Sequence, residues 1–144
     1  MFNAVQNALI KDLFLEVGSI SGVVSAGLAD NITSSTLQNV HVRASGDISG
    51  TIRAGGIASS AIASSTITDV TFTSSGKVLG AQDTGGIAPY FQESAVAKLS
   101  VVADVESLSG LAGGIAADAR IGASPSVTLT SLSFQGNVSA GKEA

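Results

Sequence analysis

Residues 55–80, GGIASSAIASSTITDVTFTSSGKVLG, contain one complete copy of the pattern that decides the fold. The copy begins with Gly56-Ile57-Ala58, in which a glycine precedes an apolar and a small residue. An apolar-x-x-apolar-x-apolar segment follows at Ile67–Phe72, and the copy ends with Val78-Leu79-Gly80. Short apolar segments separated by Gly, Ser and Asp are typical of β-strands joined by turns.

All three segments recur along the chain with a period near 30 residues. The first segment starts at Gly27, Gly56, Gly86 and Gly114, which are 29, 30 and 28 residues apart. The second starts at Ile10, Leu37, Ile67, Val96 and Leu129, and the third starts at Ile20, Ile48, Val78, Leu108 and Val138. The chain therefore contains five units, at residues 2–25, 26–53, 54–84, 85–112 and 113–141, of which the first and last are incomplete.

Three short strands in each repeating unit predict an all-β fold. We expect a parallel β-solenoid (β-helix) of about five three-sided coils, forming a single domain over residues 1–144. Stacked coils would align apolar residues in interior columns, such as Leu28/Ile57/Ile87/Ile115, Leu37/Ile67/Val96/Leu129 and Val40/Val70/Leu99/Leu132. The alternative fold is a β-sandwich of short strands, which would not require a constant period.

Two further columns of the repeat indicate features of the backbone. Glycine at Gly27, Gly56, Gly86 and Gly114 permits a positive φ at a corner, or a close approach between stacked coils. We interpret these four glycines as structural, because no helix follows them to bind a phosphate group. The second column lies inside the second segment, where we expect a turn or bulge at Asp12, Asn39, Asp69, Lys98 and Ser131.

The composition excludes several classes of protein. The chain has 144 residues, of which 12% are charged and 44% hydrophobic, so it is not a disordered tail. A net charge of −4 argues against binding to nucleic acid. The absence of cysteine excludes disulfides, cysteine-based zinc sites and thiol catalysis. We find no signal peptide at the start and no segment able to insert into a membrane.

No residue pattern predicts catalysis, a cofactor or a bound metal. His41 is the single histidine, and its position between Val40 and Val42 should direct it to solvent. Asp104 and Glu106 could share one strand face, and an enzyme acting on polysaccharides would use such a pair. A single close pair of carboxylates is insufficient evidence, so we expect no catalytic site.

Two segments suggest binding to a surface or a ligand. The aromatic pair in Pro89-Tyr90-Phe91 interrupts the fourth unit, and we expect a short protruding loop there that contacts a glycan or protein, or covers the edge of the core. Thr66-Ile67-Thr68 and Thr128-Leu129-Thr130 occupy equivalent positions, as in the flat threonine arrays that bind ice. Ala95-Val96-Ala97 lies between them in the column and interrupts the array.

Gly-Leu/Ile-Ala at this period, followed by Ser-Thr-Ile-Thr-Asp-Val and a Ser-Gly corner, resembles the GLUG repeat. The opening residues 2–13, FNAVQNALIKDL, are similar to the first coil of such arrays. In this chain Ala29, Ala58, Ala88 and Ala116 stand in place of the second Gly that gives the motif its name. GLUG repeats occur in large bacterial adhesins and in the non-catalytic region of zinc metalloproteases that cleave immunoglobulin A1. The resemblance implies an extracellular β-solenoid segment of a longer polypeptide at the bacterial cell surface.

The leading hypothesis is therefore a non-catalytic structural or binding module. Its partners would be flanking domains of a longer chain or, through end-to-end self-association, further copies; a host protein or glycan is a further candidate. The alternative is a small secreted solenoid that binds ice or glycan.

Overall fold

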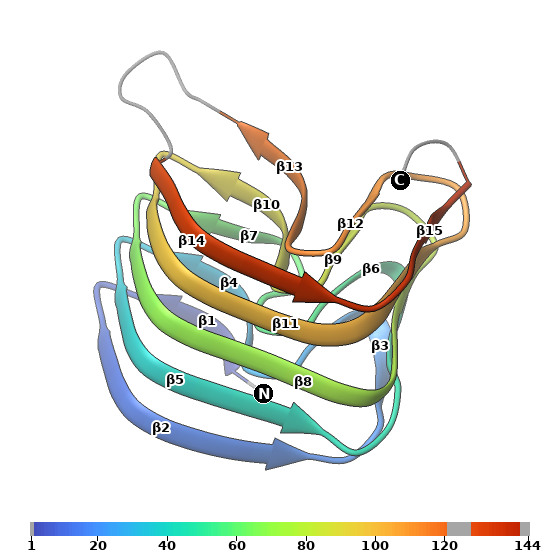
Figure 1. Cartoon of the computed structure of the whole chain (residues 1–144), viewed down its shortest axis with the longest axis horizontal. Coiled ribbons are helices and arrows are strands. Elements are labelled where there is room, and N and C mark those ends of the chain that lie inside the picture. Colours follow the sequence, from blue (N-terminus) through green and yellow to red (C-terminus); the bar gives the residue numbers. More distant parts are fainter. Residues whose placement is uncertain (1, 121–127, 142–144) are drawn as a thin grey trace.

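The computed structural model describes residues 2–120 and 128–141, and it confirms a parallel β-solenoid. The first face is a five-stranded sheet in which the chain advances by one strand per turn, through about four turns (Figure 1). Its strands are β1 (Phe2–Gln6), β4 (Ala29–Thr33), β7 (Ala61–Ala63), β10 (Ala88–Gln92) and β13 (Ala116–Arg120). Each strand pairs in parallel with the next strand of the stack.

The second face contains the longest strands. It consists of β2 (Leu9–Val17), β5 (Thr36–Ala44), β8 (Thr66–Gly80), β11 (Ala95–Ser107) and β14 (Thr128–Gln135), all in parallel ladders. β8 and β11 continue around a corner into the third face, where they join β3 (Ile20–Ala26), β6 (Ile48–Gly55) and β15 (Val138–Ala140). Two short strands, β9 (Thr84–Gly85) and β12 (Ala112–Gly113), continue the stack at the end of β6. β9 pairs in parallel with the last two residues of β6, and β12 pairs in parallel with β9.

The apolar columns expected from the repeat fill the interior. Leu37 pairs with Ile67, Ile67 with Val96, and Val96 with Leu129, so equivalent residues of successive units stack directly. Leu28, Ile57 and Ile87 are completely buried. Burial of a side chain of this size contributes about 1.5–3 kcal/mol, and these columns therefore hold successive coils together.

The polar column inside the second segment is a bend, as predicted. Asp12, Asn39, Asp69, Lys98 and Ser131 have φ values of 52°, 55°, 57°, 55° and 54°. This left-handed conformation costs most residues about 1–2 kcal/mol, and among residues other than glycine Asn and Asp tolerate it well. A second column of positive φ, at Asn7, Ser34, Ser64 and Glu93, lies at the corner between the first and second faces.

The corner glycines are required by close stacking. An added Cβ at Gly56 would overlap the carbonyl oxygen of Gly86 and the ring of Phe72, and one at Gly86 would lie 2.8 Å from Cγ1 of Val101. Gly27 and Gly114 are similarly enclosed. The other reason considered for these glycines, a positive φ, is wrong. Among the described residues the glycine with a positive φ is Gly136, which does not belong to this column.

One alignment of the third segment is also wrong. Val78 pairs with Val105, and Val105 pairs with Val138, so Val105 occupies the column that the sequence assigned to Leu108. Leu108 is 60% exposed. The register between β8 and β11 shifts at Val102/Asp104, because β8 contains extra residues at the corner. The chain can lengthen at a corner without disturbing the ladders on either side of it.

Candidate functional site

The segment Pro89-Tyr90-Phe91 is part of a strand, and the prediction of a protruding loop is wrong. It lies in β10, in the interior of the first sheet, and Phe91 pairs with Ile62 on one side and Ala119 on the other. Phe91 is 1% exposed and belongs to the core. Alternation along the strand places Tyr90 on the outer surface, so Tyr90 is the member of the pair that could contact a ligand.

Tyr90 lies in a polar cluster that joins three coils. Its hydroxyl donates a hydrogen bond to the carboxylate of Asp83, and the guanidinium of Arg53 lies 5.4 Å from the centre of its ring. Nε of Arg53 is buried and has no hydrogen-bond partner among the residues that the structure describes. Together with Ala61 and Gln92, Arg53 and Tyr90 line a shallow depression of about 240 Å³. A binding role for this surface stays a prediction.

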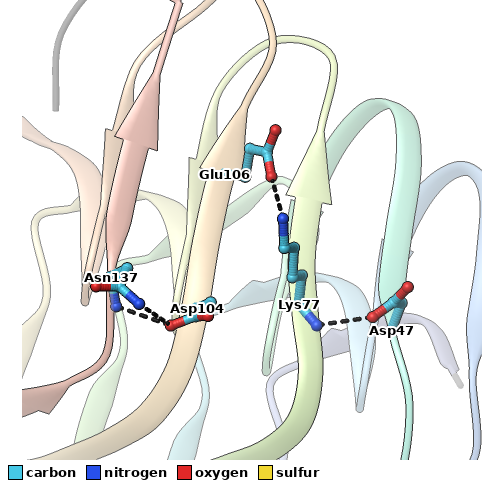
Figure 2. A network of polar contacts seen from close by, with 5 residues as sticks. All are labelled: Asp47, Lys77, Asp104, Glu106 and Asn137. Atoms are coloured by element: carbon cyan, nitrogen blue, oxygen red, sulfur yellow. Dashed lines mark hydrogen bonds and ion pairs between the residues drawn. The ribbon is translucent and has the colours of Figure 1, made fainter.

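Asp104 and Glu106 each accept a hydrogen bond from a residue of a neighbouring coil (Figure 2). Oδ1 of Asp104 accepts hydrogen bonds from the backbone N–H and the side-chain amide of Asn137, at 2.8 and 3.0 Å. Oε2 of Glu106 accepts a hydrogen bond from Nζ of Lys77 at 2.8 Å. Asp47 accepts a hydrogen bond from the backbone N–H of Lys77, also at 2.8 Å. The carboxylates of this surface therefore connect backbone and side chains of successive coils.

The pKa of Lys77 is raised above its ordinary value, because its ammonium donates a hydrogen bond to Glu106 and is attracted by that carboxylate. The charges of Asp104 and Asp47 contribute in the same direction, whereas partial desolvation opposes the shift. The carboxylate of Glu106 therefore stabilises the charged form of Lys77.

His41 is held in a ladder of polar side chains on the second face. Its Nδ1 lies 2.6 Å from Oγ1 of Thr71 and its Nε2 lies 2.8 Å from Oδ1 of Asn39. Nδ2 of Asn39 in turn donates a hydrogen bond to Asp12 at 2.8 Å. The side chain is half-buried on the outer surface, and both ring nitrogens are engaged. Within residues 2–120 and 128–141, no group of His, Asp or Glu is arranged to hold a metal ion.

A buried serine ladder is a structural feature that the sequence analysis missed. The backbone N–H of Ser35 donates to Oγ of Ser65 at 3.1 Å, and that of Ser65 donates to Oγ of Ser94 at 3.2 Å. Each hydroxyl also donates to a backbone carbonyl two residues earlier, at 2.7–2.8 Å. The three serines are 1–4% exposed, so the ladder satisfies backbone groups at a corner that water does not reach. The spacing of these serines, 30 and 29 residues, was the available signal.

A groove runs along the corner between the second and third faces, and we call it the corner groove. Its larger section, of about 710 Å³, spans three coils and is lined by Glu16, Val17, Gly18, Arg43, Ala44, Ser45, Thr73, Ser74 and Ser75. Ser74 and Ser75 also line a second section of about 240 Å³ that reaches Gln135 and Gly136 in the last coil. The Arg43 guanidinium lies 3.7 Å from Glu16 in the larger section, and both side chains are well exposed. Phe14, two residues before Glu16 in β2, is 65% exposed.

The two ends of the stack expose residues of the interior columns. At the C-terminal end, Leu129 is 42% exposed and Leu132 is 38% exposed. Their equivalents Ile67 and Val70, in the middle of the stack, are completely buried. At the N-terminal end, Ile10, Leu13 and Leu15 are packed on one side only. The terminal coils therefore have the same columns as the interior coils but, within residues 2–120 and 128–141, no neighbouring coil on one side.

In the part of the chain that the structure describes, no helix could span a membrane. Comparisons of the sequence with protein-family models and with curated proteins, and of the structure with solved structures, found no match.

Proposed function

We propose that the chain is a non-catalytic structural repeat module, a segment of a larger bacterial adhesin or surface protease, located outside the cell. The observation that carries this proposal is the open character of both terminal coils, whose apolar columns reach Leu129 and Leu132 at one end and Ile10 and Leu13 at the other. A solenoid that continues into neighbouring coils would cover these residues. The resemblance to GLUG repeats supports the same context.

The side chains that could have formed a catalytic site support this proposal. Asp104, Glu106 and His41 all bond to groups in an adjacent coil. Such bonds stabilise the stack, and they engage one oxygen of each carboxylate and both ring nitrogens of His41. If Asp104 and Glu106 were catalytic, the protein would cleave an acidic polysaccharide, and Asp104→Ala and Glu106→Ala would each abolish that activity.

The test of the proposal is the size and location of the native product. An antibody raised against the folded chain would be used on whole cells and on a lysate of the source organism. The proposal predicts surface labelling and a band far above the mass of the 144-residue chain. A single band at the mass of this chain, or a product confined to the cytosol, would contradict it.

Binding of a linear glycan is a second candidate function, and the corner groove favours it. The groove is elongated along the stack, and its walls offer hydroxyl groups and the Arg43–Glu16 pair for hydrogen bonds to sugar hydroxyls. The exposed ring of Phe14 provides an apolar surface near one wall. Phe14→Ala and Arg43→Ala should each weaken binding on an array of linear polysaccharides, whereas Phe2→Ala, which removes another exposed ring away from the groove, should not. Absence of binding by the unmodified protein would rule this candidate out.

Ice binding has less support. Along the second face, Ala95 pairs with Thr66 in the preceding coil and with Thr128 in the following coil. In the same way, Ala97 lies between Thr68 and Thr130. The threonine columns are thus interrupted in the fourth coil. A measurement of thermal hysteresis would test this function directly.

A further inference from the structure

The two ends of the solenoid present the two halves of one interface. Within the chain, each coil packs on the next through aligned apolar columns and parallel backbone ladders. Three apolar columns of the second face begin at the N-terminal end with Ile10, Leu13 and Leu15. The same columns finish at the C-terminal end with Leu129, Leu132 and Phe134, respectively. Placing one end on the other would therefore continue every apolar column of the second face.

The backbones of the terminal coils match in the same way. β13 and β1 each have five residues, and β14 and β2 have eight and nine. The bend inside these long strands has φ of 54° at Ser131 and 52° at Asp12, so a ladder between them could continue on both sides of the bend. Ser131 would also place a hydroxyl donor next to the Asp12 carboxylate. Edge strands with a row of unpaired backbone groups are ready templates for a further strand.

We propose that this chain associates head to tail with a second copy, with the N-terminal coil of one copy docked in parallel register on the C-terminal coil of the other. A second copy supplies the strands of the first and second faces at nearly equal length, together with the bend. Because the two docked surfaces differ, the contact is heterologous and does not close, so further copies would add to form a filament. This inference concerns the chain on its own and does not rest on the proposed function, under which neighbouring coils of a longer polypeptide would cover the same two surfaces.

The absence of cysteine makes a direct test of the register simple. Lys11 and Thr130 belong to one outward column, which runs through Gln38, Thr68 and Ala97. In the proposed filament, Thr130 of one copy lies beside Lys11 of the next. Neighbouring strands are about 4.8 Å apart, within the Cα separation of about 4.4–6.8 Å that a disulfide spans.

Purified Lys11→Cys and Thr130→Cys proteins would be mixed under mild oxidation. We expect a covalent heterodimer in high yield. Lys11→Cys mixed with Ser133→Cys, which lies in the neighbouring Phe14 column, should give little product. Equal yields for the two mixtures, or Lys11→Cys pairing mainly with itself, would overturn the proposal.

Blocked ends provide the second test. Leu13→Lys places a charge at the N-terminal end and Leu132→Lys places one at the C-terminal end, whereas Ala97→Lys places the same charge on a lateral face. Circular dichroism and urea unfolding would first confirm that each variant is folded. We expect both end variants to be monomeric alone and to form a dimer when mixed, because each retains one unmodified end.

The Ala97→Lys control should assemble like the unmodified chain. Monomeric unmodified chain at all accessible concentrations, or a mixture of end variants that stays monomeric, would overturn the proposal. Neither result would affect the proposed function, which depends on the size and location of the native product.

Discussion

Substitution of Gly56 by alanine tests whether the glycine corners are required by close stacking. The added Cβ would overlap the carbonyl oxygen of Gly86 and the ring of Phe72. Both groups are fixed, since Phe72 is completely buried and the Gly86 carbonyl accepts a hydrogen bond from Gly56 N–H at 3.1 Å. Overpacking costs about 1–3 kcal/mol, and loss of the hydrogen bond adds about 1 kcal/mol. We expect the free energy of unfolding to fall by about 2–4 kcal/mol.

Gly18→Ala is the matched control, because no atom of the described part of the chain lies within 4 Å of a Cβ added at Gly18. Its free energy of unfolding should stay within about 0.5 kcal/mol of that of the unmodified chain. Urea unfolding followed by circular dichroism measures both variants. For a chain of this size, the Gly56→Ala change corresponds to a decrease in Tm of roughly 6–12 °C. Equal stability of the two variants would refute the explanation of the corner glycines by close stacking.

Three other substitutions test separate parts of the fold, each by urea unfolding. Lys98→Val should lower the free energy of unfolding by about 1–2 kcal/mol, because a β-branched residue is disfavoured at φ 55°; Lys98→Gly, the control, should not lower it. Ser65→Ala should cost about 1–3 kcal/mol, because it leaves the buried N–H of Ser35 without an acceptor, and an unchanged stability would mean that the serine ladder contributes nothing. Phe91→Ala should cost about 3–5 kcal/mol if the residue belongs to the core, whereas a protruding loop would tolerate the change.

The apolar columns and the bend could be predicted from the sequence because their spacing is nearly constant. An interior residue must lie above its equivalent in the preceding coil. Apolar residues such as Leu37, Ile67 and Val96 therefore recur at a nearly constant spacing in the sequence. The bend at Asp69 was recognisable for a similar reason, since a three-residue step between Ile67 and Val70 breaks the alternation of a strand.

The features that the sequence did not predict lie at corners and on the outer faces. The number of residues at a corner varies, so Val105 rather than Leu108 continues the column of Val78. Tyr90-Phe91 suggested a loop because Pro89 and two aromatic residues interrupt a repeat of small side chains. The sheet accommodates them, with Phe91 inside and Tyr90 outside. Contacts such as Glu106 with Lys77 join residues 29 positions apart, and one-dimensional patterns of charge do not identify them.

The central claim is that equivalent residues of successive units stack directly in register. Methyl-to-methyl nuclear Overhauser effects, measured on protein with labelled Leu, Val and Ile methyl groups, test it most directly. The structure predicts contacts from Leu37 to Ile67 and from Ile67 to Val96, and no contact from Leu37 to Val96, which lies two coils away. Absence of these contacts between equivalent residues of successive units, as in a β-sandwich, would contradict the stacked solenoid and the inferences drawn from its open ends.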